Sequence, residues 1–374
     1  MEPGSEGNTM ILTRRQASGL LSGLVVAPGA AAATADLRLY RLAGTGAAGP
    51  RGDGGPAAAA ALDGPAGLAV DGDGNVLIAE LKRSAIRRVD AGSAIISTVA
   101  GNGTTGFSGD GGAATHAALN RPEGVAADRL GNLYIADSGN DRIRRVAVDG
   151  TITTVAGGGG EDPRTFDGAA TAVRLNHPAG VAVDAAGTVY FNDYGHDIIC
   201  AVTPDGRIRR IAGTGKPGYG GDGGDARAAL LNDVYGIGLD PHGTLYLCDS
   251  LNFAIRRVAD GRIETVVRGL SGTPHPKGTI GAKVPHGVDV NGDGDVFVAD
   301  TAARRLIVVR KGERQIVAGS GRPGLPVPDG TPARDADIEI HGVRVIGGGN
   351  VVFNDYRNNI VYRTADSRLS AGWQ

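Results

Sequence analysis

The amino-acid sequence predicts an all-β protein, a six-bladed β-propeller with four-stranded blades. A glycine followed by an alternating apolar run recurs at spacings of 51 to 57 residues, at Gly67, Gly124, Gly180, Gly236, Gly287 and Gly342. Four short strand patterns separated by Gly-rich turns follow the glycine, which is typical of a propeller blade. The last unit lacks its fourth strand pattern, whereas residues 37–44 (LRLYRLAG) supply an orphan before the first unit. An amino-terminal strand that completes the last blade would leave no exposed sheet edge.

The first 35 residues resemble an export signal. A twin arginine at residues 14–15 precedes an apolar stretch at 17–33, and ATA at 33–35 is a small-x-small cleavage pattern. We predict a twin-arginine-like signal over residues 1–35, cleaved after Ala35, and a single propeller over residues 36–374. The ordinary secretory route stays open, and Met10 is an alternative start. The apolar stretch is too short and too broken to span a bilayer. We therefore expect an exported protein, extracellular or periplasmic.

The amino-acid composition limits the classes of molecule that this protein is expected to bind. The chain has 38 basic and 40 acidic residues, and aromatic residues make up 4% of it. A balanced charge and scarce aromatic residues argue against nucleic-acid binding. Two cysteines, Cys200 and Cys248, lie in apolar strand patterns, and we interpret them as small buried residues. We expect a monomer that takes a small-molecule substrate or ligand, with no nucleic acid and no membrane span.

The strand patterns inside each unit carry turn signals and arginine pairs. DGDGN at residues 71–75 contains the Asp-Gly and Gly-Asn pairs of a hairpin turn. A calcium loop would need Glu at its twelfth position, where this chain has Lys82. Arginine pairs recur in the third strand pattern, at residues 87–88, 144–145 and 256–257. Because they repeat in register, we expect them on solvated faces.

The connections between units carry a family resemblance. GDGG recurs in three of them, with LxxP and PxG nearby, and YIADSGNDRIRRV and TTVAG occur in the second unit. These motifs resemble an extracellular-type NHL-repeat β-propeller over nearly all of residues 36–374. The resemblance implies the fold, but this architecture hosts enzymes, sensors and scaffolds. The fifth unit departs from the pattern because it lacks GDGG.

The sequence GxGxxG occurs at residues 44, 101 and 213. A dinucleotide-binding loop needs a strand before it and a helix after it in a parallel sheet. Here the motif recurs at the same place in three units and precedes an Ala-rich loop. We therefore expect no nucleotide cofactor.

The strongest candidates for function lie where the first strand of each blade meets the central channel. The residue before each anchoring glycine is expected at the channel mouth; these are Ala66, Glu123, Ala179, Tyr235, His286 and His341. The loops between the second and third strands open on the same face. They add Glu80, Lys82, Asn192, Asp193, Tyr194, Asn354, Asp355 and Tyr356.

These residue types suggest metal-assisted acid–base chemistry. His286, His341 and Glu123 form a possible ligand set for one divalent metal, with zinc as the first choice. Tyr194, Tyr235, Tyr356 and Asp193 are the candidate catalytic groups. Substrate binding is assigned to Glu80, Lys82, Asn192, Asn354 and Asp355. VPHG at 284–287 and IHG at 340–342 resemble the zinc-binding histidine positions of the peptidyl-hydroxyglycine amidating-lyase propeller, which implies a lyase.

We therefore expect an enzyme of lyase or isomerase type that acts on a small polar molecule at the mouth. A non-catalytic ligand- or glycan-binding propeller is the alternative, and a protein-interaction scaffold that uses the GDGG loops is a third. The Asp that ends the second strand recurs in five units, so it could simply bond local turn amides. His177 follows Asn176 in a loop, and we interpret it as surface.

Overall fold

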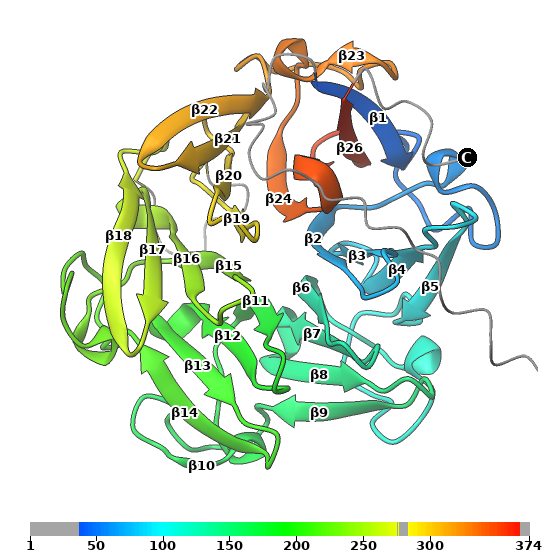
Figure 1. Ribbon diagram of the computed structural model, residues 1–374. Coiled ribbons are helices and arrows are strands. Elements are labelled where there is room, and N and C mark those ends of the chain that lie inside the picture. Colours follow the sequence, from blue (N-terminus) through cyan, green and yellow to red (C-terminus); the bar gives the residue numbers. More distant parts are fainter. Residues whose placement is uncertain (1–36, 275, 277–282, 367–374) are drawn as a thin grey trace, which may run out of the picture. The chain divides into compact units, whose positions relative to one another are not determined.

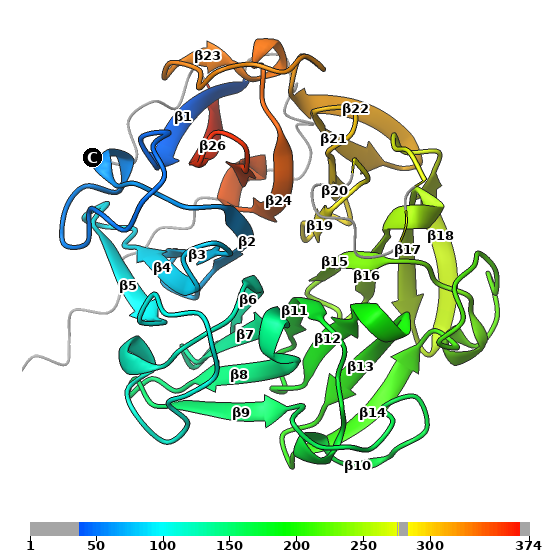
Figure 2. The ribbon, with the colours of Figure 1, turned by 180° about the vertical axis from the view of Figure 1, so that it is seen from behind.

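The computed structural model describes residues 37–274, 276 and 283–366. The predicted export signal at residues 1–35 lies outside the described residues. No helix among those described is long and apolar enough to cross a membrane. The described residues form six antiparallel sheets around a central channel, with no α-helix (Figures 1 and 2).

The first three blades follow the chain order from the channel outward. Blade 1 has β2 (Pro65–Val70), β3 (Val76–Glu80), β4 (Ala85–Val89) and β5 (Ile96–Ala100). Blade 2 has β6 (Pro122–Ala127), β7 (Leu133–Asp137), β8 (Arg142–Val146) and β9 (Ile152–Ala156). Blade 3 has β11 (Pro178–Val183), β12 (Val189–Asp193), β13 (Ile198–Val202) and β14 (Arg207–Ala212), with β10 (Gly168–Ala169) added at its outer edge.

The last three blades repeat this order, and the sixth is completed from the other end of the chain. Blade 4 has β15 (Val234–Leu239), β16 (Leu245–Asp249), β17 (Ala254–Ala259) and β18 (Arg262–Arg268). Blade 5 has β19 (Gly287–Val290), β20 (Val296–Asp300), β21 (Arg305–Arg310) and β22 (Glu313–Ala318). Blade 6 has β24 (Ile340–Val345), β25 (Val351–Asp355), β26 (Ile360–Asp366), β1 (Leu37–Ala43) and the short outer strand β23 (Thr331–Pro332).

Short 3-10 helices lie in the connections between strands. Those between blades are η2 (Ala57–Ala59), η3 (Ala114–His116), η5 (Ala170–Ala172), η7 (Ala226–Ala228) and η9 (Ala333–Asp335). Those within blades are η4 (Ser138–Asn140), η6 (Tyr194–His196), η8 (Ser250–Asn252) and η10 (Gly347–Gly349).

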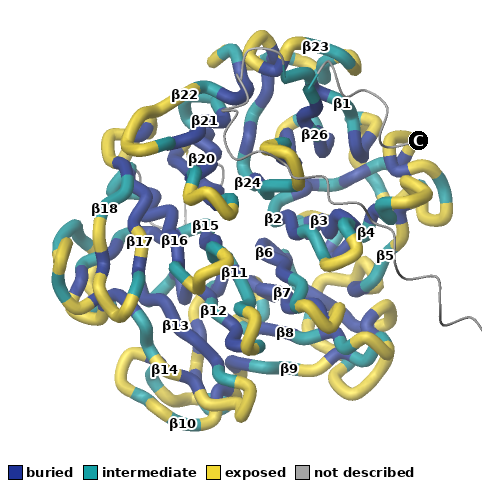
Figure 3. Tube along the Cα trace, viewed as in Figure 1, coloured by how far each residue is buried: buried dark blue, intermediate teal, exposed yellow. Residues whose placement is uncertain are grey.

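The amino-terminal strand closes the ring, as the sequence predicts. β1 runs antiparallel to β26, with Leu37 opposite Asp366 and Leu39 opposite Thr364. Leu39 is fully buried in the apolar core that blades 5 and 6 share. The described core consists of six such clusters between neighbouring blades. Figure 3 shows burial along the strands and exposure at the outer loops.

The six anchoring glycines bring the inner strands close together. A Cβ atom on Gly67 would lie 2.4 Å from the carbonyl oxygen of Glu123, and one on Gly124 would lie 2.3 Å from that of Ala179. The same contact recurs around the whole ring, with the last step from Gly342 to Ala66 O at 2.7 Å. Any larger residue would push adjacent blades apart, which explains why glycine recurs with the blade period.

The sequence suggests that the arginine pairs are solvated, but one member of each pair is buried. The first member of each pair, Arg87, Arg144 or Arg256, is fully buried. Each joins the carboxylate that ends the second strand of its blade to the Asp of a GDGG loop. The expectation was wrong for these three because alternate residues of a strand point to opposite faces. Cys200 and Cys248 are buried free thiols, as expected.

Candidate functional site

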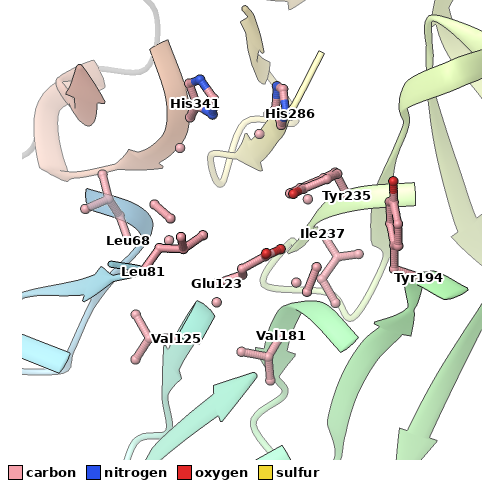
Figure 4. Close-up of a pocket in the computed structure, with 18 of the residues that line it drawn as sticks. Leu68, Leu81, Glu123, Val125, Val181, Tyr194, Tyr235, Ile237, His286 and His341 are labelled. Atoms are coloured by element: carbon pink, nitrogen blue, oxygen red, sulfur yellow. The ribbon is translucent and has the colours of Figure 1, made fainter. Parts of the chain in front are cut away.

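A cavity of about 540 Å³ lies in the central channel and is bordered by all six inner strands. The residues before the anchoring glycines line it, as predicted: Ala66, Glu123, Ala179, Tyr235, His286 and His341. The residues after these glycines form an aliphatic wall, made of Leu68, Val125, Val181, Ile237, Val288 and Val343. Figure 4 shows the Tyr235 hydroxyl and the Glu123 carboxylate directed into the cavity.

Aromatic and imidazole rings form a continuous arc around one side of this cavity. The order is His177, Tyr194, Tyr235, His286, His341 and Tyr356. Successive ring centroids are 5.7, 5.4, 4.8, 4.4 and 4.6 Å apart. The first three contacts are edge-to-face and the last two are stacked, so blades 3 to 6 present one aromatic surface. On blade 1 the lining side chains are small or aliphatic, Ala66, Leu68 and Leu81.

At one end of the arc, an imidazole is paired with a buried carboxylate. His177 Nε2 lies 3.0 Å from Glu123 Oε1, and Arg121 Nη2 lies 3.8 Å from the same oxygen. The Glu123 side chain is only 3% exposed. Burial lowers the pKa of His177, but the Glu123 carboxylate more than offsets this, so the net pKa is raised. Glu123 Oε2 is buried, and the Tyr235 hydroxyl interacts with the same carboxylate.

A second imidazole–carboxylate pair lies on blade 6. His341 Nε2 is 3.6 Å from Glu339 Oε1, and Arg304 Nη1 donates to Glu339 Oε2 at 2.7 Å. The His341 imidazole and then the Arg304 guanidinium hold the pKa of Glu339 at about 2. Glu339 therefore stays ionised beside the imidazole at neutral pH.

His286 lies between these pairs and has a different environment. The residue is 7% exposed, and its Nδ1 lies 3.1 Å from Thr301 Oγ1. It is stacked on His341 with an angle of 28° between the ring planes. Within the described residues, the three imidazoles of one cavity thus contact different groups: a carboxylate for His177, a carboxylate for His341, and the Thr301 hydroxyl for His286.

The arrangement of His286, His341 and Glu123 does not fit the predicted zinc ligand set. Imidazole lone pairs lie in the ring plane, so two rings stacked face to face direct them side by side rather than to a shared ion at about 2.0–2.1 Å. Glu123 is already paired with His177 and Arg121. In the described part of the chain, no group of three or more His, Cys, Asp or Glu side chains could hold a metal ion.

The three predicted tyrosines all line the cavity, and each is held as a neutral phenol. The Tyr194 hydroxyl donates to Asp233 Oδ2 at 2.7 Å. Burial, and then the negative charge of Glu123, raises the pKa of Tyr235 well above its usual value. The same two causes raise the pKa of Tyr356. Tyr235 and Tyr356 therefore stay protonated at neutral pH and can donate hydrogen bonds, but they are not phenolate bases.

The other predicted site residues do not line the cavity. Asn192 and Asn354 are buried, and each joins its own blade to the next one. Asn192 Oδ1 accepts from Gly180 N, and its Nδ2 donates to Val234 O of the next blade. Asn354 Oδ1 accepts from Gly342 N, and its Nδ2 donates to the carbonyl oxygens of Pro65 and Ala66. Their polar atoms hold the inner strands together. A role in substrate binding gains no support from these contacts.

The carboxylates that end the second strands also have framework contacts. Asp193 accepts from Asn176 N at 2.8 Å and lies 2.7 Å from His196 Nδ1. Glu80 accepts from Asp63 N, and Asp355 accepts from Glu339 N. All three are fully buried, and burial raises their pKa values. Lys82 is exposed, with Nζ 5.8 Å from the Tyr356 ring centroid.

Sequence reasoning missed Arg121 and His177, which occupy the position three residues before the anchoring glycine. Both have positive φ angles, 50° and 56°. The Asp141 carboxylate accepts the His177 backbone N–H at 2.7 Å and supports this conformation. The side chain that was interpreted as loop surface therefore lines the cavity. Its blade-periodic position was the available signal.

Comparisons with known proteins agree with this architecture. A family model described as the teneurin NHL domain matches residues 102–165. Protein SUPPRESSOR OF QUENCHING 1, chloroplastic, of Arabidopsis thaliana is 29% identical over 68% of this chain and 26% of that protein. Teneurin-1 of Mus musculus is 37% identical over 28% of this chain and 4% of that protein. The chain thus spans about a quarter of the plant relative's length and far less of teneurin's.

Solved structures show the same fold at low sequence identity. An auxiliary nutrient binding protein of Bacteroides ovatus has a TM-score of 0.60 at 14% identity, covering 88% of this chain and 76% of that one. A gluconolactonase of Xanthomonas campestris has a TM-score of 0.55 at 14% identity, covering 90% and 93%. A streptogramin B lyase structure has a TM-score of 0.51 at 16% identity, covering 88% and 98%.

These findings define a class of protein, the six-bladed β-propeller with a polar channel mouth. The six sheets confirm the prediction of a six-bladed β-propeller. The partial match to a teneurin NHL domain model agrees with the NHL-repeat resemblance over residues 102–165.

Proposed function

We propose that the channel mouth is the active site of an exported enzyme that moves a proton on a small polar molecule, in a reaction of lyase or isomerase type. A cavity of about 540 Å³ is in the usual size range for small-molecule sites. Its aliphatic wall and aromatic arc would surround most of such a ligand, and the polar groups are concentrated on the arc.

The observation that carries this proposal is the set of three imidazoles with different partners. His177 is paired with Glu123, His341 with Glu339, and His286 with the Thr301 hydroxyl. Acid and base roles are separated when titratable groups around one site have environments that favour different protonation states. Protonated tyrosines beside them add further donors. The proposal needs no metal ion.

Binding without chemistry is the second candidate. The cavity combines an aliphatic wall with the protonated phenols of Tyr235 and Tyr356, which could donate hydrogen bonds to a small polar ligand. A nutrient-binding propeller also shares the fold. The scaffold alternative is less favoured, because Asp53, Asp110 and Asp222 of the GDGG loops are paired with buried arginines of the same chain.

Solvent deuterium exchange tests the proposal even while the product of the reaction is unidentified. The protein would be incubated in D₂O with sugar lactones, 2-hydroxy acids and cyclic peptide esters, and exchange at carbon would be followed by proton NMR. We expect exchange with at least one class, lost in His177→Gln or His286→Gln. His242→Gln is the matched control, because His242 lies in an exposed turn between β15 and β16.

Binding of a compound with no exchange in any class would overturn the enzyme proposal and favour the binding propeller. Exchange that persists in both cavity variants would place the chemistry elsewhere.

A further inference from the structure

The hydroxyl of Thr301 links blade 5 to blade 6. Thr301 follows β20, and its Oγ1 lies 2.6 Å from the carbonyl oxygen of Ile340, the first residue of β24. A second carbonyl, that of Ala299, lies 3.5 Å away. Carbonyl oxygens only accept hydrogen bonds, and a threonine hydroxyl has a single proton. The Thr301 proton is therefore committed to a backbone carbonyl.

This commitment fixes the direction of the bond between Thr301 and His286. With its proton on a carbonyl, Thr301 Oγ1 can only accept from His286 Nδ1, which is 3.1 Å away. In a neutral imidazole, one ring nitrogen is a donor and the other is an acceptor. A hydrogen on Nδ1 makes Nε2 the acceptor nitrogen.

We propose that Thr301 is a positioning residue that holds His286 in its Nδ1–H tautomer, so that Nε2 is the base atom of the mouth. The chemistry rests on the function proposed above, whereas the tautomer rests on the Thr301 contacts alone. The substrate class is a small carbon acid, with a C–H bond next to a carbonyl group. Nε2 takes that proton, the C–H electron pair stays on the substrate, and the imidazolium keeps its Nδ1–H bond to Thr301.

Blade 4 has an equivalent hydroxyl, that of Ser250, which allows the role of Thr301 in blade 5 to be compared. Ser250 Oγ donates to Pro285 O, at the start of the next blade, at 2.7 Å. The link between blades is thus the same as that of Thr301. The mouth residue of blade 4 is Tyr235, whereas that of blade 5 is His286. Thr301 therefore combines the link between blades with the orientation of an imidazole.

Nitrogen-15 NMR of the full chain labelled at histidine reads the tautomer directly and needs no substrate. At a pH where His286 is neutral, we expect a protonated Nδ1 and an unprotonated Nε2, with signals assigned by their loss in His286→Gln. Thr301→Val should abolish the fixed tautomer, and Thr301→Ser should restore it. Ser250→Ala is the matched control, since it removes the equivalent link but leaves Thr301 in place. An Nε2–H tautomer in the wild-type protein would overturn the proposal, even if Thr301→Val does not fold.

The deuterium exchange assay separates the two proposals. Thr301→Val should slow exchange about 10- to 100-fold, by analogy with the loss of residues that orient metal-bound imidazoles. Thr301→Ser should retain most of the rate. The predicted tautomer without exchange by any compound would reject the enzyme and keep the inference about Thr301. Exchange that depends on His286 but not on Thr301 would keep the enzyme proposal and reject the positioning role of Thr301.

Discussion

Arg144 Nη2 lies 2.7 Å from Asp110 Oδ1, although 34 residues separate the two in the chain. Asp110 belongs to a GDGG loop, and Arg144 also bonds the Asp that ends the second strand of its blade. Blades 1, 2 and 4 contain this arrangement. At the register position of the arginine, blades 3, 5 and 6 have Cys200, Ile307 and Tyr362, and none of the connections leading into these blades contains GDGG. The motif and the buried arginine therefore occur together.

Arg144→Leu should destabilise the protein by about 3–5 kcal/mol, because it leaves the buried carboxylate of Asp137 without its cation. Arg145→Leu, one residue away and partly exposed, should change stability by less than about 1 kcal/mol. Urea unfolding of both variants measures this difference. Equal effects would show that the buried ion pair has no special role.

Glu123→Gln should lower the pKa of His177. In the native protein, burial lowers this pKa, and the hydrogen bond and charge of Glu123 more than offset it. With the charge removed, burial dominates and the pKa should fall below its ordinary value. The native pair stabilises the fold below the unfolded-state pKa, and this contribution is lost as pH rises through the higher folded-state pKa. NMR titration of His177 checks the shift, with Glu339→Gln as the control that leaves it unchanged.

Elemental mass spectrometry should find well below one equivalent of zinc in protein purified without chelator or a histidine tag. The reason is the stacked geometry of His286 and His341, which directs their lone pairs apart from a common point. The double variant His286→Ala with His341→Ala is the comparison. One equivalent that disappears in the double variant would restore the metal-site prediction.

Asp355 should make stability fall as pH rises from about 4 to about 6. Burial raises the pKa of this carboxyl to about 6 from 3.8, so the folded protein binds a proton that the unfolded chain has released. The slope due to one such group is at most about 1.4 kcal/mol per pH unit. The unfolding free energies of the wild type and of Asp355→Asn would be measured between pH 4 and 7.5, and their pH dependence between about pH 4 and 6 should differ by up to this slope. Parallel curves would contradict it.

Leu39→Ala should cost about 2–5 kcal/mol, because Leu39 is fully buried in the strand that closes the ring. Leu325→Ala is the matched control, since Leu325 is 82% exposed. Thermal and urea unfolding would both report the difference. A small effect at Leu39 would mean that ring closure contributes little to stability.

The fold was predictable because its determinants repeat. The anchoring glycines are needed wherever inner strands touch, and the orphan strand at residues 37–44 matches a missing strand in the last blade. The same logic placed Glu123, Tyr235, His286 and His341 at the mouth, because they occupy one position of the repeat. The period of the sequence repeat therefore predicts where a residue lies within its blade.

Side-chain direction and partner choice were harder to predict. His177 lines the cavity because its positive φ turns a loop residue inward, which residue type alone does not indicate. The buried arginines look exposed in sequence because their partners are 34 residues away in another connection. Asn192 and Asn354 resemble ligand-binding amides, but backbone groups of the next blade take their hydrogen-bonding capacity.

The pairing of β1 with β26 also sets an order of events during biosynthesis. Among the described strands, β1, which completes blade 6, is made first, and its neighbour β26 is made last. Until then the nascent chain is an open crescent with two unpaired sheet edges, the kind of surface that invites association with other chains. Polypeptides interrupted before Ile360 would keep both edges, so premature termination should yield aggregation-prone fragments rather than smaller working propellers.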